Sequence, residues 1–278
     1  MSVRKIYIAL SQFCEDDESP RRVLLDAGFD VRENRSGKRL RPEEIRREVA
    51  GADAVIAGVE PYDVETLAAL PGLRCISRCG VGTDSIDLEA AKRMGIAVRN
   101  TPEEVVEPVA QVTLAMILAL ARNFPVYIAE ARAHQWKRHS GYLLSEWTIG
   151  LIGFGRIARA VEQYLRPFGS TILVTDPNIR SSDVPANVKL CDLPTLLRSA
   201  DVVSLHASRP SAEGALLGPD QFALMKKGSR IVNTARGHLI HEPSLLGALV
   251  SGHLSGAALD VFETEPYSGP LADLPQVL

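Results

Sequence analysis

The sequence has few cysteines, few aromatic residues and no long apolar run. Its 278 residues include four cysteines, and 5% of the residues are aromatic. Cys14, Cys75, Cys79 and Cys191 match neither a disulfide framework nor a paired metal-ligand spacing. We therefore expect no metal and a reducing cytoplasm. The apolar run near the amino terminus, residues 6–10, is too short for a secretory signal peptide.

Neither a membrane span nor a basic surface is predicted. The longest apolar stretch, Val109 to Ala121, contains Gln111 and Thr113 and falls short of the roughly 20 residues that cross a bilayer. We interpret it as a buried helix. With 31 Lys and Arg against 34 Asp and Glu, the net charge of -3 provides no cationic field for a phosphate backbone. We therefore expect neither a nucleic acid nor a membrane as a partner.

Short β-rich runs alternate with helical runs along the whole chain, which predicts an α/β protein with parallel sheets covered by helices. A chain of 278 residues exceeds what one hydrophobic core usually organises, so we expect two domains. The residue before Pro102 is restricted to non-helical geometry, and we place the boundary there, giving domains 1–99 and 100–278. Strands are expected at residues 5–10, 29–33, 54–57, 74–77, 97–99, 148–152, 171–175, 202–205, 230–233 and 257–259.

Apolar residues at spacings of three and four predict the helices. They are expected at residues 20–27, 42–50, 64–70, 88–94, 107–122 and 159–168. The segment 123–146 shows no clear strand and contains Trp136 and Tyr142. We expect it to form an exposed arm at a subunit interface, and hence a homodimer.

A dinucleotide-binding motif follows the predicted strand at residues 148–152. Residues 153–158 read Gly-Phe-Gly-Arg-Ile-Ala and precede a helical run, which is the pattern G-x-G-x-x-A in its usual context. Gly153 permits the tight turn, Gly155 lets a diphosphate approach the backbone, and Ala158 lets the helix lie against the strand. The helix N-terminus favours the phosphate charge. A glycine pattern alone also occurs in ordinary turns.

An acidic residue follows the next predicted strand, at the position where a Rossmann fold contacts the adenosine ribose. Asp176 can accept both ribose hydroxyls and repel the 2′-phosphate of NADP, so NAD is predicted as the cofactor. The alternative is that Asp176 only begins an Asp-Pro turn. Arg180 would weaken the preference for NAD if it turned towards the ribose.

Further segments of the chain carry glycine, arginine and acidic residues in a recognisable order. They are Cys-Gly-Val-Gly-Thr-Asp-Ser-Ile-Asp at 79–87, Asn-Thr-Pro at 100–102, Val-Ser-Leu-His at 203–206, Val-Asn-Thr-Ala-Arg-Gly at 232–237 and Leu-Asp-Val-Phe-Glu-Thr-Glu-Pro at 259–266. With the glycine motif, these segments resemble the NAD-dependent D-2-hydroxyacid dehydrogenases, most closely the phosphoglycerate dehydrogenase branch. The resemblance covers most of the chain from about residue 50.

The resemblance implies two doubly wound parallel-sheet domains. The first, at 1–99, is a flavodoxin-like substrate domain that a C-terminal segment normally completes, and the second, at 100–278, is a Rossmann NAD-binding domain. The cofactor-binding residues it implies, together with those of the glycine motif, are Gly153, Gly155, Arg156, Ile157, Asp176, His206, Thr234, Ala235 and Asp260. Asp260 would contact the nicotinamide amide, although it could also simply cap a turn.

Substrate binding is assigned to two places. By resemblance, Gly80, Val81 and Gly82 hold the substrate carboxylate with backbone N–H groups, where composition alone would favour a plain turn. Arg236 lies just beyond the strand at 230–233, and its planar guanidinium suits a carboxylate and a polarised carbonyl oxygen. Without the motif around it, an arginine there would be interpreted as a surface residue.

The resemblance also implies a catalytic histidine that is oriented by Glu265. That histidine would follow Leu278, and none of the chain's own histidines fits its place: His134, His139, His206, His238, His241 and His253. We therefore expect the chain to be cut short and, as it stands, severely impaired, because general acid–base catalysis contributes about 10² to 10⁴ in rate.

These observations predict an enzyme that transfers a hydride between NAD(H) and C2 of a small D-2-hydroxy acid or 2-keto acid, with an acid similar to 3-phosphoglycerate as one candidate. Arg236 and Glu265 are its predicted catalytic residues. Two alternatives remain open at this point. One is an NAD-sensing binding protein of the corepressor kind, and the other is a formate or phosphite dehydrogenase on the same scaffold.

Overall fold

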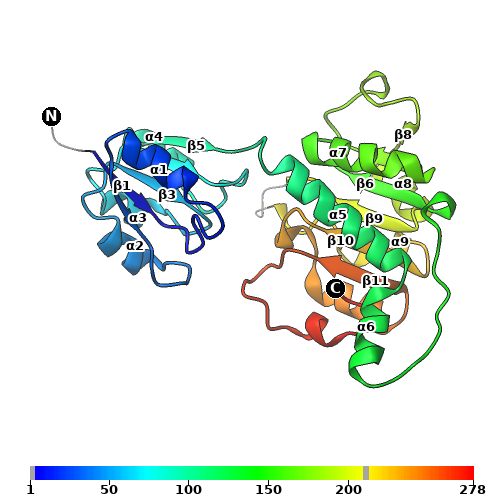
Figure 1. Cartoon of the computed structure of the whole chain (residues 1–278). Helices are drawn as coiled ribbons and strands as arrows, with labels where there is room; N and C mark the ends of the chain where they lie inside the picture. Colours follow the sequence, from blue (N-terminus) through cyan, green and yellow to red (C-terminus); the bar gives the residue numbers. More distant parts are fainter. Residues whose placement is uncertain (1–3, 209–212) are drawn as a thin grey trace. The chain divides into compact units, whose positions relative to one another are not determined.

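The protein is described here from a computed structural model that covers residues 4–208 and 213–278. The chain divides into two compact units, Met1–Val105 and Val106–Leu278. Each unit is built around its own parallel sheet (Figure 1). The α/β fold with two parallel-sheet domains predicted from the sequence is therefore confirmed.

The first unit contains a five-stranded sheet in the order β2-β1-β3-β4-β5. This is the doubly wound order of flavodoxin-like sheets. Its strands are β1 (Lys5–Ile8), β2 (Asp30–Glu33), β3 (Ala54–Ala57), β4 (Cys75–Arg78) and β5 (Ala97–Asn100). The helices between them are α1 (Ser19–Asp26), α2 (Pro42–Glu48), α3 (Val64–Ala68) and α4 (Leu88–Arg93). Each central strand contributes fully buried side chains, such as Ile8, Val55 and Ile76.

The end of β4 determines where the predicted substrate-binding loop at residues 80–82 begins. The strand begins and ends one residue later than predicted, because it pairs with β5 as far as Arg78 opposite Asn100. Cys79 continues this alignment by donating its N–H to the carbonyl of Ala57 at 2.8 Å. The loop with Gly80 and Gly82 therefore begins directly at the carboxyl edge of the sheet, where open α/β sheets bind their ligands.

The second unit contains a six-stranded sheet in the order β11-β10-β9-β6-β7-β8. Counted from β6, this is the Rossmann order 3-2-1-4-5-6. The strands are β6 (Thr148–Ile152), β7 (Thr171–Thr175), β8 (Val188–Leu190), β9 (Val202–Leu205), β10 (Ser229–Asn233) and β11 (Leu254–Leu259). The α-helices are α5 (Val106–Ala121), α6 (Phe124–Arg132), α7 (Arg156–Leu165), α8 (Leu193–Ser199), α9 (Pro219–Leu224) and α10 (Glu242–Val250).

Several features of the second unit differ from the sequence prediction, among them the helices α8, α9 and α10, which were not predicted. The edge strand β8 was missed because its three residues are too few to show an alternating pattern. Helix α7 begins at Arg156 and not at residue 159, because Gly155 is its N-cap and accepts the N–H of Arg159. The predicted arm contains the helix α6, which follows a left-handed Asn123 and has a proline in its first turn.

Helix α5 is a core element of the second unit, as its apolar composition predicted. It packs against α7, β10 and β11, and Ala110, Ile117 and Ala121 are completely buried. No single helix in the described ranges is long and apolar enough to cross a membrane. Helices α5 and α6 pass that test only as a pair, and the chain bends by 68° between them.

Candidate active site

The glycine turn after β6 is enclosed by the two neighbouring strands. Gly153 has φ +88°, and a Cβ at this position would lie 2.8 Å from the carbonyl carbon and oxygen of His206. Gly153 donates its N–H to Thr175 at the end of β7 (2.8 Å), and His206 donates its N–H to Ile152 (2.7 Å). Only glycine has both the conformation and the size that this turn requires.

Open space lies beyond the turn. A Cβ added to Gly155 would meet nothing within 4 Å, and the first turn of α7 follows at Arg156 and Ile157. The first N–H groups of a helix have no carbonyl partner within it and carry partial positive charge. Ala158 is completely buried. This cradle fits a diphosphate, which the residues from Gly153 to Ile157 would hold.

Asp176 lies directly beside the glycine turn. One carboxylate oxygen accepts the N–H of Phe154 at 2.8 Å, and the other accepts the N–H of Asn178 at 2.8 Å. The second bond is that of an Asp-Pro turn, so the structural role considered in the sequence is present. The first bond fixes the carboxylate next to the phosphate cradle. The two interpretations of Asp176 are therefore compatible.

His206 follows β9 and lies over the same turn. Its Nε2 is 2.9 Å from the hydroxyl oxygen of Ser204. Burial lowers the pKa of His206 from 6.5 to about 4, because the charged imidazolium would lose its hydration. The ring is therefore neutral near pH 7, and it hydrogen-bonds to Ser204 in this form.

The loop after β10 carries Thr234, Ala235 and Arg236. Its conformation is fixed by Asn233, which is 1% exposed. The amide of Asn233 accepts the N–H of Ala235 at 3.0 Å and donates to the carbonyl of Arg236 at 2.9 Å. The Thr234 hydroxyl is 2.9 Å from that of Thr113 on α5. Sequence reasoning missed Asn233 as a positioning residue, although a polar residue ending a buried strand is a usable signal.

Arg236 is half-buried at the carboxyl edge of the sheet. One of its guanidinium nitrogens donates to the carbonyl of Ala235 at 2.7 Å, which turns the side chain back along its own loop. The next residue, Gly237, packs against the loop after β11. A Cβ on Gly237 would lie 1.9 Å from the carbonyl carbon of Phe262. The loops that carry Arg236 and Glu265 are therefore in direct backbone contact.

The loop after β11 carries Asp260 and Glu265, and both side chains are exposed. Asp260 donates its N–H to the carbonyl of Asn233 at 2.9 Å, so the two loops share a hydrogen bond as well as a contact. The carboxylate of Glu265 accepts the N–H of Phe262 at 3.0 Å. The rings of Phe262 and Tyr267 stack with centroids 4.0 Å apart. These hydrogen bonds and the stacked rings thus restrain the loop that carries Glu265.

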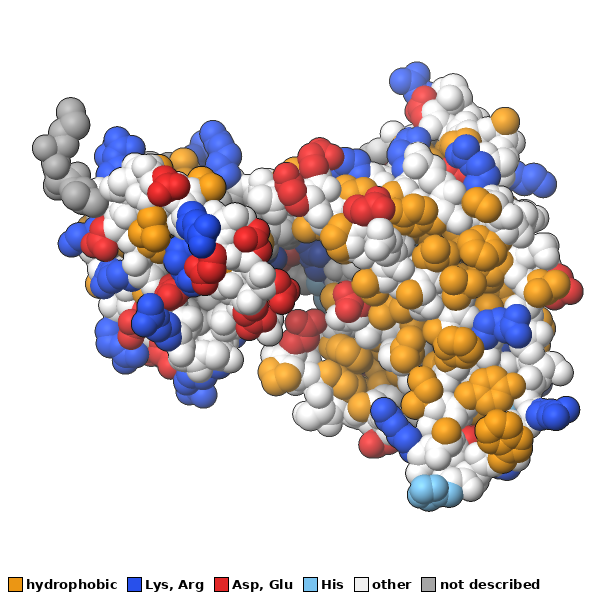
Figure 2. Space-filling view, viewed as in Figure 1, with side chains coloured by type: hydrophobic (Ala, Val, Ile, Leu, Met, Phe, Trp, Pro, Cys, Tyr) orange, Lys and Arg blue, Asp and Glu red, His pale blue; other side chains and the backbone are white. Residues whose placement is uncertain are grey.

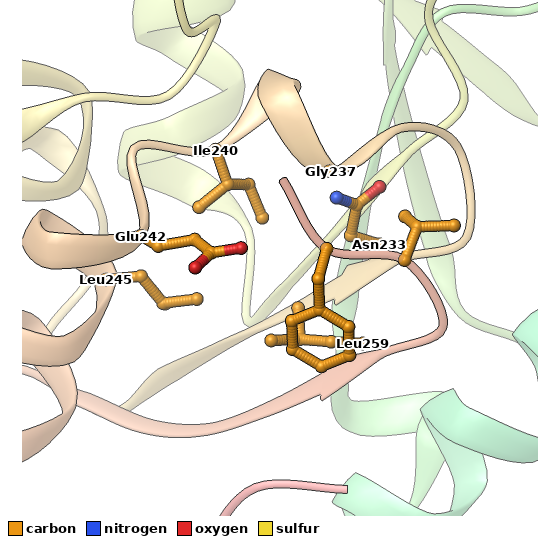
Figure 3. Close-up of a pocket in the computed structure, with 8 residues that line it drawn as sticks. Asn233, Gly237, Ile240, Glu242, Leu245 and Leu259 are labelled. Carbon is orange, nitrogen blue, oxygen red and sulfur yellow. The ribbon is translucent and has the colours of Figure 1, made fainter. Parts of the chain in front are cut away.

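A small pocket lies beneath these two loops. Figure 3 shows Asn233 and Gly237 on one side of it, and Ile240, Glu242 and Leu245 on the other. Its lining also includes Leu259, Val261 and Phe262. The carboxylate of Glu242 points into this pocket and accepts the N–H of Glu263 at 2.9 Å.

The loop after β4 in the first unit is shaped by its first glycine. Gly80 has φ +129°, and a Cβ on it would lie 2.5 Å from a guanidinium nitrogen of Arg78. Gly80 donates its N–H to the hydroxyl of Thr101 at 2.7 Å, and Asn100 donates its side-chain N–H to the carbonyl of Val81 at 2.8 Å. The N–H of Gly80 is therefore used inside the unit, which leaves Val81 and Gly82 as the candidate donors to a carboxylate.

The second unit thus has the fold and the phosphate cradle of a dinucleotide-binding protein. Residues 114–278 match the model of the NAD-binding domain of the D-isomer specific 2-hydroxyacid dehydrogenases, which is more than half of the chain. The protein belongs to this family. The resemblance drawn from the sequence is confirmed, as is NAD as the cofactor.

Named relatives agree with this family. D-3-phosphoglycerate dehydrogenase of Mycobacterium tuberculosis is 36% identical over 241 residues, covering 85% of this chain and 46% of that protein. The human D-3-phosphoglycerate dehydrogenase is 36% identical over 270 residues, covering 95% of this chain and 49% of that protein. The chain thus spans about half the length of these curated relatives.

A solved structure agrees with the fold along the whole chain. The putative D-isomer specific 2-hydroxyacid dehydrogenase from Polaromonas superposes with a TM-score of 0.88 at 28% identity. The match covers 100% of this chain and 88% of that one.

We predict that Gly153→Ala weakens NADH binding at least tenfold, because a methyl group cannot fit against His206 in the left-handed turn. Gly252→Ala is the matched control, since Gly252 also has positive φ (+69°) but nothing lies within 4 Å of its Cβ position. The control should lose about 1–2 kcal/mol of stability and bind NADH normally. Fluorescence titration gives both affinities. Equal NADH affinity in the two variants would contradict this interpretation of the turn.

The lowered pKa of His206 predicts a pH-dependent stability. Between pH 6.5 and about 4 the unfolded chain binds a proton at His206 that the folded protein does not, so stability falls as the pH decreases through this range. Urea unfolding at several pH values measures the slope. His206→Gln should flatten this slope between pH 6.5 and 4.5. An unaltered slope in His206→Gln would contradict the assignment.

Proposed function

We propose that the protein is an NAD-dependent oxidoreductase that transfers a hydride between the nicotinamide and C2 of a small D-2-hydroxy acid or 2-keto acid. One observation carries the proposal. Arg236 and Glu265 lie on adjoining loops at the same sheet edge as the glycine turn and Asp176. The comparisons favour this reaction over an NAD sensor and over formate or phosphite oxidation.

The residues of the second unit would divide the work as follows. Bound NAD supplies the hydride acceptor. Gly153, Gly155, Arg156, Ile157 and Asp176 would hold its diphosphate and ribose. The remaining cofactor contacts would come from His206, Thr234, Ala235 and Asp260, which follow β9, β10 and β11.

Substrate binding would use one fixed cation and one backbone loop. The guanidinium of Arg236 can donate two parallel hydrogen bonds to a carboxylate and polarise the oxygen on C2. In the first unit, the N–H groups of Val81 and Gly82 would be donors to a substrate carboxylate, in a loop that Gly80 shapes. We accordingly assign substrate binding to the first unit and NAD binding to the second, with the boundary at Val105 and Val106 in place of the expected 99 and 100.

Glu265 would assist proton transfer at the oxygen on C2 of the substrate. A carboxylate beside an imidazole stabilises its charged form and fixes its orientation, which is the role the family resemblance implies. The hydrogen bond from Phe262 holds Glu265 in one place, so that the carboxylate need not be ordered during the reaction.

With four free cysteines, the chain suits a reducing compartment, and we propose the cytoplasm as its location.

The direct experiment is steady-state NADH oxidation by the full-length protein with a panel of 2-keto acids. The panel includes glyoxylate, pyruvate, a branched 2-keto acid and 3-phosphohydroxypyruvate, and the reverse reaction is run with the D- and L-hydroxy acids, formate and phosphite. Activity restricted to D-2-hydroxy acids and their 2-keto partners supports the proposal. Tight NADH binding without turnover of any compound would favour the sensor instead.

Arg236→Lys tests the substrate-binding role. Lysine keeps the charge but cannot form the bidentate contact, so kcat/KM for the best 2-keto acid should fall at least 100-fold while the Kd for NADH changes less than threefold. Arg198→Lys on helix α8 is the control and should leave both constants unchanged. A variant at Arg236 with normal kcat/KM would exclude this role.

We also propose that the protein is a homodimer that associates through the second unit. Hydrophobic side chains gather on its face around α5 and α6 (Figure 2). The exposed large hydrophobic residues of α5, α6 and the segment that follows α6 are Val112, Phe124, Ile128, Trp136, Tyr142 and Leu143. Exposed apolar surface of this kind marks protein–protein contacts, and the predicted arm at 123–146 supplies five of these six residues.

Ile128→Glu tests the dimer. A charge in the middle of an apolar interface is costly to desolvate, so the variant should elute as a monomer at concentrations where the wild type is dimeric. Light scattering coupled to size exclusion measures the mass. Val250→Glu introduces the same charge at an exposed apolar residue of α10 and should remain dimeric. A wild-type monomer, or a dimeric Ile128→Glu, would refute this interface.

A further inference from the structure

Two carboxylates hold the loop that follows β11. Glu265 accepts the N–H of Phe262 at 3.0 Å, and Glu242 accepts the N–H of the next residue, Glu263, at 2.9 Å. The first bond lies within the loop. The second comes from Glu242, the first residue of α10, which is 21 residues away in the sequence.

We propose that Glu242 is a positioning residue that fixes the Glu265 carboxylate for the reaction. This inference rests on the proposed function, because it assigns Glu242 a role through Glu265. Glu242 does not need to touch substrate or cofactor for this role. It needs only to hold the backbone from which Glu265 projects.

Glu242 and Gly237 both restrain the loop after β11. On the opposite side of the pocket, Gly237 abuts Phe262 so closely that no side chain fits between them (Figure 3). That contact prevents the loop from moving towards β10. The bond from Glu242 ties the same loop to the start of α10. Both restraints act on the peptide bond between Phe262 and Glu263, directly next to the Phe262 N–H group that binds Glu265.

The chemistry of the bond suits such a role. A carboxylate accepting a backbone N–H makes a charge-assisted hydrogen bond, which is stronger and shorter than one between neutral groups. Glu242 lies in the first turn of α10, where the helix dipole stabilises its negative charge. The helix thus stabilises the charge of the Glu242 carboxylate while one of its oxygens binds the loop after β11.

The test compares four variants of the full-length protein: Glu242→Ala, Glu242→Gln, Glu265→Gln and the double variant Glu242→Ala/Glu265→Gln. Asp192→Ala is the matched control. Asp192 accepts a backbone N–H at the start of α8 at 2.7 Å, so its loss removes the same kind of bond elsewhere in this unit. The measurements are kcat and its pH profile with the best 2-keto acid, the Kd for NADH, and amide hydrogen exchange of residues 261–267.

We expect Glu242→Ala to lower kcat roughly tenfold, because small misplacements of a reacting group are costly. It should also shift the pH profile, speed exchange across residues 261–267 and leave the Kd for NADH within about twofold. Glu242→Gln should retain most of kcat, since its amide oxygen still accepts the N–H. Asp192→Ala should leave kcat, the pH profile and that exchange unchanged.

The double variant distinguishes positioning from a general structural role. If Glu242 acts through Glu265, Glu242→Ala should have little further effect on kcat in the Glu265→Gln protein. Fully additive losses, or unchanged exchange in Glu242→Ala, would overturn the inference. A wild-type enzyme inactive with every acid would overturn the proposed function, and the exchange measurement would still decide whether Glu242 anchors the loop.

Discussion

Close backbone contact between loops at the carboxyl edge of the second sheet is the constraint on which the candidate site depends. At Gly153 and at Gly237 a neighbouring backbone lies where a Cβ would be. The first contact joins the turn after β6 to the strand end of β9, and the second joins the loops after β10 and β11. Parallel strands bring these loops to one edge, and the two glycines allow them to touch.

Polar side chains then fix what the glycines bring together. Asn233 holds the Arg236 loop from inside, Asp176 holds the glycine turn, and Glu242 holds the loop of Glu265. Each of the three is bonded to backbone N–H or carbonyl groups and lies beside a residue assigned to catalysis or cofactor binding. The site is therefore built as much from loop restraints as from the groups that would meet NAD and substrate, which is the general condition for a preorganised active site.

Much of this arrangement could be predicted from residues near one another in the sequence. The central strands β3, β6, β7 and β9 were placed with their observed bounds, because each is a short buried run next to turn residues. The glycine motif could be recognised because strand, turn and helix follow in order. The predictions failed where the signal was short or ambiguous. Strand β8 has three residues, and α6 lies in a stretch with few periodic apolar residues.

The sequence by itself determined the parallel α/β fold, the NAD motif and the family, since these depend on local patterns and on the order of motifs. Only the tertiary structure decided that Thr101 accepts the N–H of Gly80 and that Glu242 accepts the N–H of Glu263. The physical reason is distance along the chain. Such contacts join backbone groups to side chains on other loops, and their partners are chosen by how the strands align and not by neighbouring residues.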